Sequence, residues 1–257
     1  MKLFGKIKLL NKIIIPVMFL FFWEMVSHII VKKLVLLPPP SKVFYSLYEM
    51  ILSGEIFVHS LDSILRVLSG FIIAGSVAIP VGLIMGWNNL VEKLLDTSVN
   101  MLRPIPATAW IPASILLFGI GNKPALFLVF IGTVWPLLLN TISGVKSIDK
   151  IYIMAAQTMG VKGKALFKKV VLPAALPEIF TGIRIGMGVA WTCVIVAELL
   201  AVRSGLGYLI MESRLLVRPD KVFAGMIMIA IIGLGLDYFT RVLMNVFLHW
   251  RKGLKVE

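Results

Sequence analysis

Charged and metal-binding side chains are scarce in this sequence. Its 257 residues include one cysteine and three histidines, and aspartate and glutamate together number 13. With Cys193 alone, the chain can form no internal disulfide. The histidines have no acidic or cysteine partners at a spacing that would suit a metal site or a catalytic cluster. The sequence therefore predicts neither a metal centre nor an enzyme. The histidines are His28, His59 and His249.

Charged residues make up 15% of the chain, and hydrophobic residues make up 59%. A soluble domain has typically about 25% charged and about 45–50% apolar residues. The mean hydropathy of +0.95 points in the same direction. Composition therefore predicts an all-α integral membrane protein, with residues 1–257 forming a single transmembrane domain.

Six apolar stretches approach the roughly 20 residues that a spanning helix needs. We expect about six transmembrane helices, at residues 13–31, 67–87, 104–119, 125–145, 180–201 and 222–246. The third stretch is short and rich in proline, so it is expected to be kinked or partly irregular. Irregular backbone at membrane depth requires cover from protein or a water-filled cavity. Candidates for a gate or translocation pathway are therefore Arg103, Pro104, Pro106 and Trp110.

Basic residues are distributed unevenly between the two sets of connecting segments. They gather near both termini and in residues 146–177, whereas the opposite connections hold fewer. Because positively charged loops stay in the cytoplasm, both termini and residues 146–177 are expected there. This topology accounts for the net charge of +13, and we expect no nucleic-acid partner. Residues 38–65 are expected on the other side, with a helix lying along the membrane surface.

A short basic stretch, MAAQTMGVKGKALFKKVVLPAALP at residues 154–177, interrupts the apolar second half of the chain. Residues 151–159 can form a helix that Gly160 ends, because glycine adopts the left-handed cap conformation without strain. A second helix is expected over residues 164–171, with Pro173 ending it and Pro177 opening the next span. Such a segment could lie on anionic lipid or dock into a groove of a cytoplasmic partner.

Acidic side chains within spans are costly and are usually functional or paired. Glu198 lies near the outer end of the fifth expected span. It could shape a gate, or it could pair with a basic residue such as Arg203 and hold a loop. Asp237 and Arg241 lie four positions apart and are expected to form a helix ion pair. Residues 182–188, GIRIGMG, are expected to allow close helix packing.

The basic stretch resembles the loop of ATP-binding-cassette (ABC) importer permeases. The family pattern is E-A-A-x-x-x-G, nine residues, then I-x-L-P. This chain keeps every spacing, with Met154 in place of the glutamate and Val170 in place of the isoleucine. Residues 103–121, RPIPATAWIPASILLFGIG, and 196–210, VAELLAVRSGLGYLI, resemble motifs of the nitrate/sulfonate/taurine/bicarbonate branch of these permeases. The resemblance covers nearly the whole chain.

The resemblance implies a type I ABC importer permease fold in the inner or plasma membrane, with a cytoplasmic coupling-helix loop at residues 146–177. A cytoplasmic ATPase dimer would dock on the loop, and an extracytoplasmic binding protein would deliver the solute. A second permease copy, expected as a homodimer, would complete the pathway, and membrane lipid would surround it. By position, the coupling residues would be Met154, Ala155, Ala156, Gly160, Leu166, Leu172 and Pro173.

The chain lacks the G-x-x-x-x-G-K-[ST] pattern that cradles nucleotide phosphates. ATP and magnesium are therefore expected on the ATPase, and no cofactor is expected in this chain. The solute implied is a small anion such as an aliphatic sulfonate, taurine or nitrate, although similar sequences serve aminopyrimidines and vitamin-like compounds. A secondary transporter driven by an ion gradient would account for acids within spans, but it would not account for the loop spacing.

Overall fold

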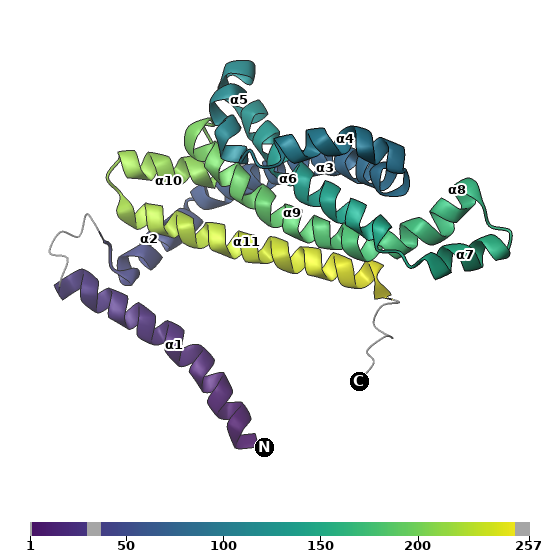
Figure 1. Ribbon diagram of the computed structural model, residues 1–257. Helices are drawn as coiled ribbons and strands as arrows, with labels where there is room; N and C mark the ends of the chain where they lie inside the picture. The colour runs from purple at the N-terminus through teal and green to yellow at the C-terminus, as the bar shows by residue number, and fades with distance from the viewer. Residues whose placement is uncertain (1, 30–36, 250–257) are drawn as a thin grey trace.

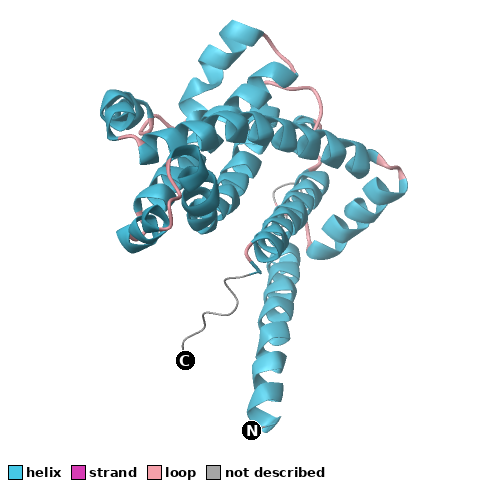
Figure 2. Cartoon of the chain, turned by 90° about the vertical axis from the view of Figure 1, so that its right-hand side faces the viewer, coloured by secondary structure: helices cyan, strands magenta, loops and turns pink. Residues whose placement is uncertain are grey.

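The computed structural model describes residues 2–29 and 37–249, with the backbone alone for residues 2–13 and 16. Every element in those ranges is a helix (Figures 1 and 2). The helices are α1 (Lys2–Ile29), α2 (Pro40–Leu52), α3 (Glu55–Trp87), α4 (Asn89–Leu102), η1 (Ala107–Trp110), α5 (Ile111–Phe118), α6 (Asn122–Lys146), α7 (Lys150–Thr158), α8 (Gly163–Leu166), η2 (Phe167–Val171), α9 (Leu172–Leu200), α10 (Leu206–Leu215) and α11 (Pro219–Phe247).

Helix α6 forms the centre of the bundle and packs extensively against both α3 and α9. Glycines allow this close approach, since a Cβ on Gly70 of α3 would lie 2.6 Å from a Val129 methyl of α6. On α9, a Cβ at Gly182 would lie 2.9 Å from the Cβ of Asn140 of α6. The predicted role of residues 182–188 in close helix packing is therefore confirmed at Gly182.

Four helices are long and apolar enough to cross a membrane: Glu55–Trp87, Asn122–Lys146, Gly163–Leu200 and Pro219–Phe247. They coincide with the second, fourth, fifth and sixth expected spans. Over the first expected span, the apolar part of the described residues is the shorter stretch Val17–Ile29. Residues 30 and 31 of that expected span lie outside the described residues. Within the described chain, four helices, or five if one bent pair is counted, are long and apolar enough to cross a membrane.

The expected third span, residues 104–119, is not a single helix. Its residues divide between an irregular turn, η1 and α5, and α5 is only 8 residues long. Helix α4 and the Ala107–Phe118 segment are together long and apolar enough to cross a membrane, but their axes differ by 80°. Pro104 and Pro106 favour the break, because a proline has no N–H to donate and its ring clashes with the preceding turn of a helix.

The second spanning helix begins earlier than the sequence predicts. Residues 55–65 were expected on the membrane surface, yet they form the first three turns of α3. The break falls instead at Gly54, whose φ of +78° separates α3 from α2. A left-handed glycine therefore divides α2 from α3 at a position that hydropathy does not mark.

The fifth span also begins earlier, because Pro173 does not end the preceding helix. The chain passes through a π-helical turn, η2, directly into α9, and Pro173 occupies the first turn of α9. Proline is tolerated there because its missing N–H would have no regular intrahelical partner. Pro177, expected to open the span, lies within α9.

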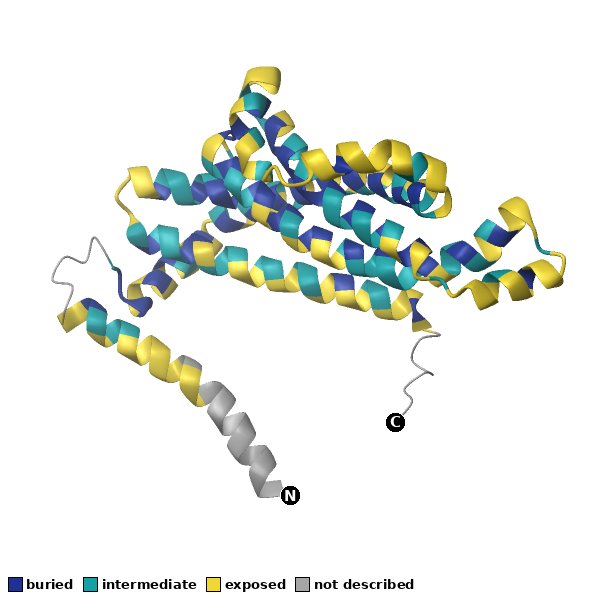
Figure 3. Ribbon diagram, in the orientation of Figure 1, coloured by how far each residue is buried: buried dark blue, intermediate teal, exposed yellow. Residues whose placement is uncertain are grey.

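Much of the outward face of the bundle is exposed (Figure 3). Many of the exposed residues have large apolar side chains. On α11, Leu234 and Tyr238 are 72% and 70% exposed. A soluble monomer rarely exposes contiguous apolar surface of this kind. The surface is therefore suited to contact with lipid tails or with another transmembrane chain.

Candidate functional site

A helical hairpin extends from one end of the bundle, beyond the ends of α6 and α9 (Figure 1). It consists of α7, α8 and η2, residues 150–171, and we call it the coupling hairpin. The bundle end from which it extends is called the hairpin end, and the opposite end, where α10 lies, is called the far end. The apolar side chains Leu166 and Val171 anchor the hairpin and are buried.

Capping interactions define the ends of α7. The Asp149 carboxylate accepts a hydrogen bond from the N–H of Ile151 at 3.0 Å and caps the N-terminus. At the other end, Gly160 has a φ of +84°. The N–H of Val161 donates to the carbonyl of Ala156 at 3.0 Å, and the N–H of Gly160 donates to that of Gln157 at 2.9 Å. These bonds form a Schellman motif, and the prediction that Gly160 ends this helix is confirmed.

Substitutions at Gly160 can test whether backbone strain sets the hairpin turn. A Cβ at this position would meet no atom within 4 Å, so the cost of a side chain comes from the backbone conformation alone. We expect Gly160→Val to destabilise the hairpin by about 1–2 kcal/mol and to speed hydrogen exchange across residues 150–171. Gly160→Asn should have a smaller effect, because asparagine tolerates this conformation. Equal exchange in the two variants would rule out strain as the cause.

The predicted coupling residues divide into exposed and buried groups. Met154, Ala155 and Gly160 are exposed, whereas Ala156 and Leu166 are buried within the chain. Leu172 and Pro173 lie half-buried in the first turn of α9. A partner approaching the hairpin therefore meets α7, whereas Ala156 and Leu166 hold the hairpin together.

Helix α7 also exposes large apolar side chains that sequence reasoning did not select. Ile151 is 63% exposed, Tyr152 is 65% exposed and Met159, just beyond the helix, is 84% exposed. Met154 adds to this surface at 56%. Exposing large apolar side chains to water is unfavourable for a helix outside the spanning bundle. This surface is therefore suited to contact with a protein partner or a membrane.

The candidate pathway residues do not form one site. Arg103, Pro104 and Pro106 are exposed at the bend between α4 and η1. Trp110 is half-buried, and its ring meets that of Phe127 edge-on at 6.2 Å between centroids. It packs on the apolar cluster that contains Ala197, which precedes Glu198. Trp110 is thus the candidate from this stretch that packs beside the Glu198 region.

Glu198 is fully buried near the far end and is held by three neighbours. Its Oε1 lies 2.7 Å from Nη1 of Arg66, whose side chain is 7% exposed. Its Oε2 accepts hydrogen bonds from Ser63 Oγ at 2.8 Å and from the N–H of Gly207 at 3.0 Å. The predicted partner Arg203 is therefore wrong, and the partner is Arg66, which directly precedes the expected start of the second span.

The same arginine and serine extend the contacts to other elements. Arg66 donates through Nε to Asn122 Oδ1 of α6 at 2.8 Å, and through Nη1 to the carbonyl of Ser204 at 2.9 Å. Ser63 Oγ accepts a hydrogen bond from the N–H of Leu206 at 2.9 Å. These contacts join α3, α6, α9 and the loop that leads into α10. We call Ser63, Arg66, Asn122, Glu198 and Ser204 the far-end cluster.

Within the far-end cluster, the hydrogen bonds to the carboxylate of Glu198 all come from the chain itself. Both carboxylate oxygens accept such bonds. A buried carboxylate requires such compensation, because an unpaired charge in the interior is costly. Glu198 could shape a gate or hold a loop through an ion pair. The geometry favours the second role, with Arg66 as the basic partner.

The sequence matches a known family of membrane transport proteins. Residues 78–249 match the family model described as binding-protein-dependent transport system inner membrane component. The chain belongs to this family. It is thus a multi-pass inner-membrane permease of an ABC transporter, a subunit that performs no catalysis itself.

Relatives of this permease match it over most of their length. It is 44% identical to a protein of Methanocaldococcus jannaschii named as an ABC transporter permease, over 96% of this chain and 94% of that protein. It is 36% identical to a Bacillus subtilis protein named as an aliphatic sulfonates transport permease, with coverages of 93% and 87%. It is 33% identical to the taurine transport system permease protein of Escherichia coli, with coverages of 89% and 85%.

A solved structure shares the fold of the permease at low sequence identity. It is an inward-facing conformation of the MetNI methionine ABC transporter, with a TM-score of 0.63 and 17% identity. The match covers 74% of this chain and 96% of that chain. It confirms the type I importer permease fold that the loop resemblance implies.

A second charged group of the permease lies on α9 and α11. Asp237 pairs with Arg241 at 2.6 Å, which confirms the predicted helix ion pair. It also pairs with Arg184 of α9 at 2.8 Å, so the carboxylate bridges two spans. Among the described residues, no group of three or more His, Cys, Asp or Glu side chains could hold a metal ion.

Proposed function

We propose that this permease forms the translocation pathway of an ATP-driven importer for a small sulfonate-type anion, such as an aliphatic sulfonate or taurine. The observation that carries the proposal is the coupling hairpin, with its exposed apolar α7 outside the spanning bundle. In this arrangement an ATPase dimer binds the hairpin, a second copy of the permease completes the pathway, and a binding protein delivers the anion at the far end.

Exposure within α7 supports its role as the docking helix. Ala155 is small and exposed, so a groove wall can approach the helix axis at this position. Met154 and Met159 flank it with flexible apolar side chains, which adapt well to a partner surface. A short helix with a small central residue and apolar anchors matches helix-in-groove recognition. ATP and magnesium then belong to the ATPase.

The proposed orientation places the hairpin end in the cytoplasm. The hairpin carries five lysines, Lys150, Lys162, Lys164, Lys168 and Lys169. Helix α11 ends on the same side of the bundle as the hairpin (Figure 1). Basic segments are retained in the cytoplasm, which supports a cytoplasmic position for the hairpin and both termini.

The names of two relatives and the charge of the far end support an anionic solute. One relative is named for aliphatic sulfonates and another for taurine, and both solutes carry a sulfonate group. The permease has a groove of about 430 Å³ at the far end, lined in part by Asn122, Arg203 and Ser204. A guanidinium beside amide and hydroxyl donors suits an oxyanion arriving from outside.

Enlarging Ala155 is expected to abolish retention of the ATPase. Ala155→Gln keeps a strong helix former but puts a longer side chain where a groove wall must approach. The matched control is Ala165→Gln, since Ala165 is also exposed on the hairpin but lies on α8. Each variant would be co-expressed with the ATPase encoded beside it, and co-purification from detergent-solubilised membranes would be measured. We expect wild type and Ala165→Gln to retain the ATPase and Ala155→Gln to lose it.

Other outcomes of this pull-down would contradict the docking proposal. Retention of the ATPase by Ala155→Gln at the wild-type level would show that α7 is not the docking helix. Failure of the wild-type permease to retain any ATPase would count against ATP-driven import itself. The solute is tested separately, by uptake of taurine into proteoliposomes that contain the complete transporter and its binding protein.

A further inference from the structure

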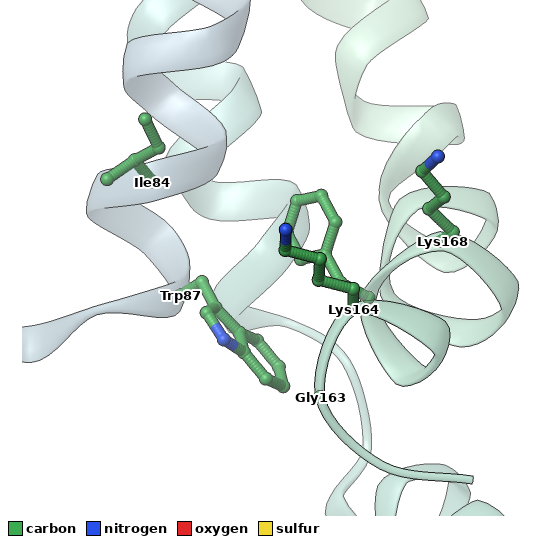
Figure 4. Close-up of a pocket in the computed structure, with 6 residues that line it drawn as sticks. Ile84, Trp87, Gly163, Lys164 and Lys168 are labelled. Carbon is green, nitrogen blue, oxygen red and sulfur yellow. The ribbon is translucent and has the colours of Figure 1, made fainter.

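A groove of about 320 Å³ lies between the last turn of α3 and the coupling hairpin (Figure 4). Its lining residues are Ile84, Trp87, Gly163, Lys164, Phe167 and Lys168. Apart from the two lysines, the lining side chains are apolar. The groove therefore combines an apolar wall on a spanning helix with two positively charged side chains on a segment outside the bundle.

The apolar wall lies where a spanning helix ends. Ile84 and Trp87 belong to the last turn of α3 and are 52% and 43% exposed. The Trp87 ring meets the Phe167 ring edge-on, with 6.1 Å between centroids and an angle of 74°. Tryptophan at the end of a spanning helix is typical of the boundary between hydrocarbon and headgroups. The groove therefore opens at the depth where a lipid has both an acyl chain and a phosphate.

The two lysines line the groove from the side of the hairpin. Lys164 and Lys168 are four positions apart, and Lys164 extends toward α3 (Figure 4). Across the described part of the chain, the lysines with a carboxylate within 4.0 Å are Lys146 and Lys221. Both groove lysines thus keep their charge available for an anion.

We infer that this groove binds an anionic phospholipid. The phosphate lies between the ammonium groups of Lys164 and Lys168, and the acyl chain runs along Ile84 and Trp87. A soluble anion would use only the lysines, whereas a lipid uses both the charges and the apolar wall. This inference goes beyond the proposed function, because it does not depend on the solute or on the docking of the ATPase. A lipid at this place would connect a span directly to the coupling hairpin.

Native mass spectrometry of the full-length permease can test the charge requirement. The protein would be equilibrated with equal amounts of phosphatidylglycerol and phosphatidylcholine in detergent. Lys164→Gln/Lys168→Gln removes both groove charges, and Lys162→Gln/Lys169→Gln removes two exposed hairpin charges outside the groove. We expect wild type and the control pair to prefer phosphatidylglycerol. The groove pair should lose up to about thirtyfold of that preference, which corresponds to two lysines near a lipid surface.

Fluorescence quenching tests the apolar wall. Phosphatidylglycerol brominated on its acyl chains should quench the fluorescence of Trp87. The Trp87 signal is the fluorescence of wild type minus that of Trp87→Phe. This signal should fall more with brominated phosphatidylglycerol than with brominated phosphatidylcholine. Equal loss of preference in both lysine pairs would overturn the inference, because the hairpin would then bind lipid through its overall charge. Displacement of the lipid by glycerol 3-phosphate, or absence of Trp87 quenching, would also overturn it, since each would show a site for the headgroup alone.

Discussion

Replacing Arg66 with methionine is expected to destabilise the permease by about 3–5 kcal/mol. The substitution leaves the carboxylate of Glu198 buried with its 2.7 Å partner removed. It also removes the donors to Asn122 and to the carbonyl of Ser204. For a chain of this size, each kcal/mol shifts the unfolding midpoint by roughly 2–4 °C. The apparent Tm in detergent should therefore fall by at least about 6 °C.

A double variant separates the ion pair from the general cost of substitution. Arg66→Met/Glu198→Met removes both buried charges, so it should be more stable than the sum of the two single variants predicts. Circular dichroism melts of the wild type, both single variants and the double variant complete the cycle. Additive losses would show that Arg66 and Glu198 do not interact as the structure indicates.

Replacing Gly205 with alanine is expected to destabilise the same region by roughly 3–5 kcal/mol, through strain and overlap together. Gly205 has a φ of +103°, and its Cβ would lie under 3.0 Å from both carboxylate oxygens of Glu198. The buried carboxylate cannot move away without losing the bonds that hold it. Thermal unfolding, together with the yield of monodisperse permease, would measure the loss.

Substitutions at two other glycines separate the cost of backbone strain from the cost of steric overlap at Gly205. Gly54 has a φ of +78° with open space around it, so Gly54→Ala reports strain alone and should cost about 1–2 kcal/mol. Gly188 lies within α9, with no atom within 4 Å of its added Cβ, so Gly188→Ala should be neutral or slightly stabilising. If Gly205→Ala were no worse than Gly54→Ala, the overlap with Glu198 would be absent in solution.

Local signals in the sequence predicted the turn of the coupling hairpin. A left-handed glycine ends α7 as expected, because this signal depends only on neighbouring residues. The burial of Leu166, which was named as a coupling residue, was not predicted. Hydropathy located the helices of the four long spans, because their outward faces are apolar along the whole length. The exposure of Ala155 against the burial of Ala156 could not be predicted, since it depends on how α7 is set against the bundle.

The far-end cluster shows why the buried contacts were missed. Arg66 and Glu198 are 132 positions apart in sequence, and no local pattern relates them. Glu198 drew attention because an acid within a span is unusual. Arg66 did not, because it falls at the expected edge of a span, where arginine is ordinary. The early start of α3 at Glu55 places it inside the bundle instead.

Proline was the least reliable guide to helix ends. Pro104 and Pro106 break the third span as expected, but Pro173 and Pro177 are accommodated in a continuous helix. The difference lies in the π-helical turn before Pro173, which hydropathy and residue preference do not show. Proline therefore predicts a disturbance of the helix, and its surroundings decide between a break and a change of helical type.

The uninterrupted helix from Gly163 to Leu200 has a mechanical consequence. Its 38 residues, at about 1.5 Å each, make a stiff rod of roughly 57 Å. One end of the rod forms part of the coupling hairpin, and the other carries Glu198. No flexible loop lies between them, so a displacement of the hairpin must arrive at the far end as tilt, rotation or bending of the rod. The regular α-helical hydrogen bonding changes on that line at the π-helical turn and at Pro177.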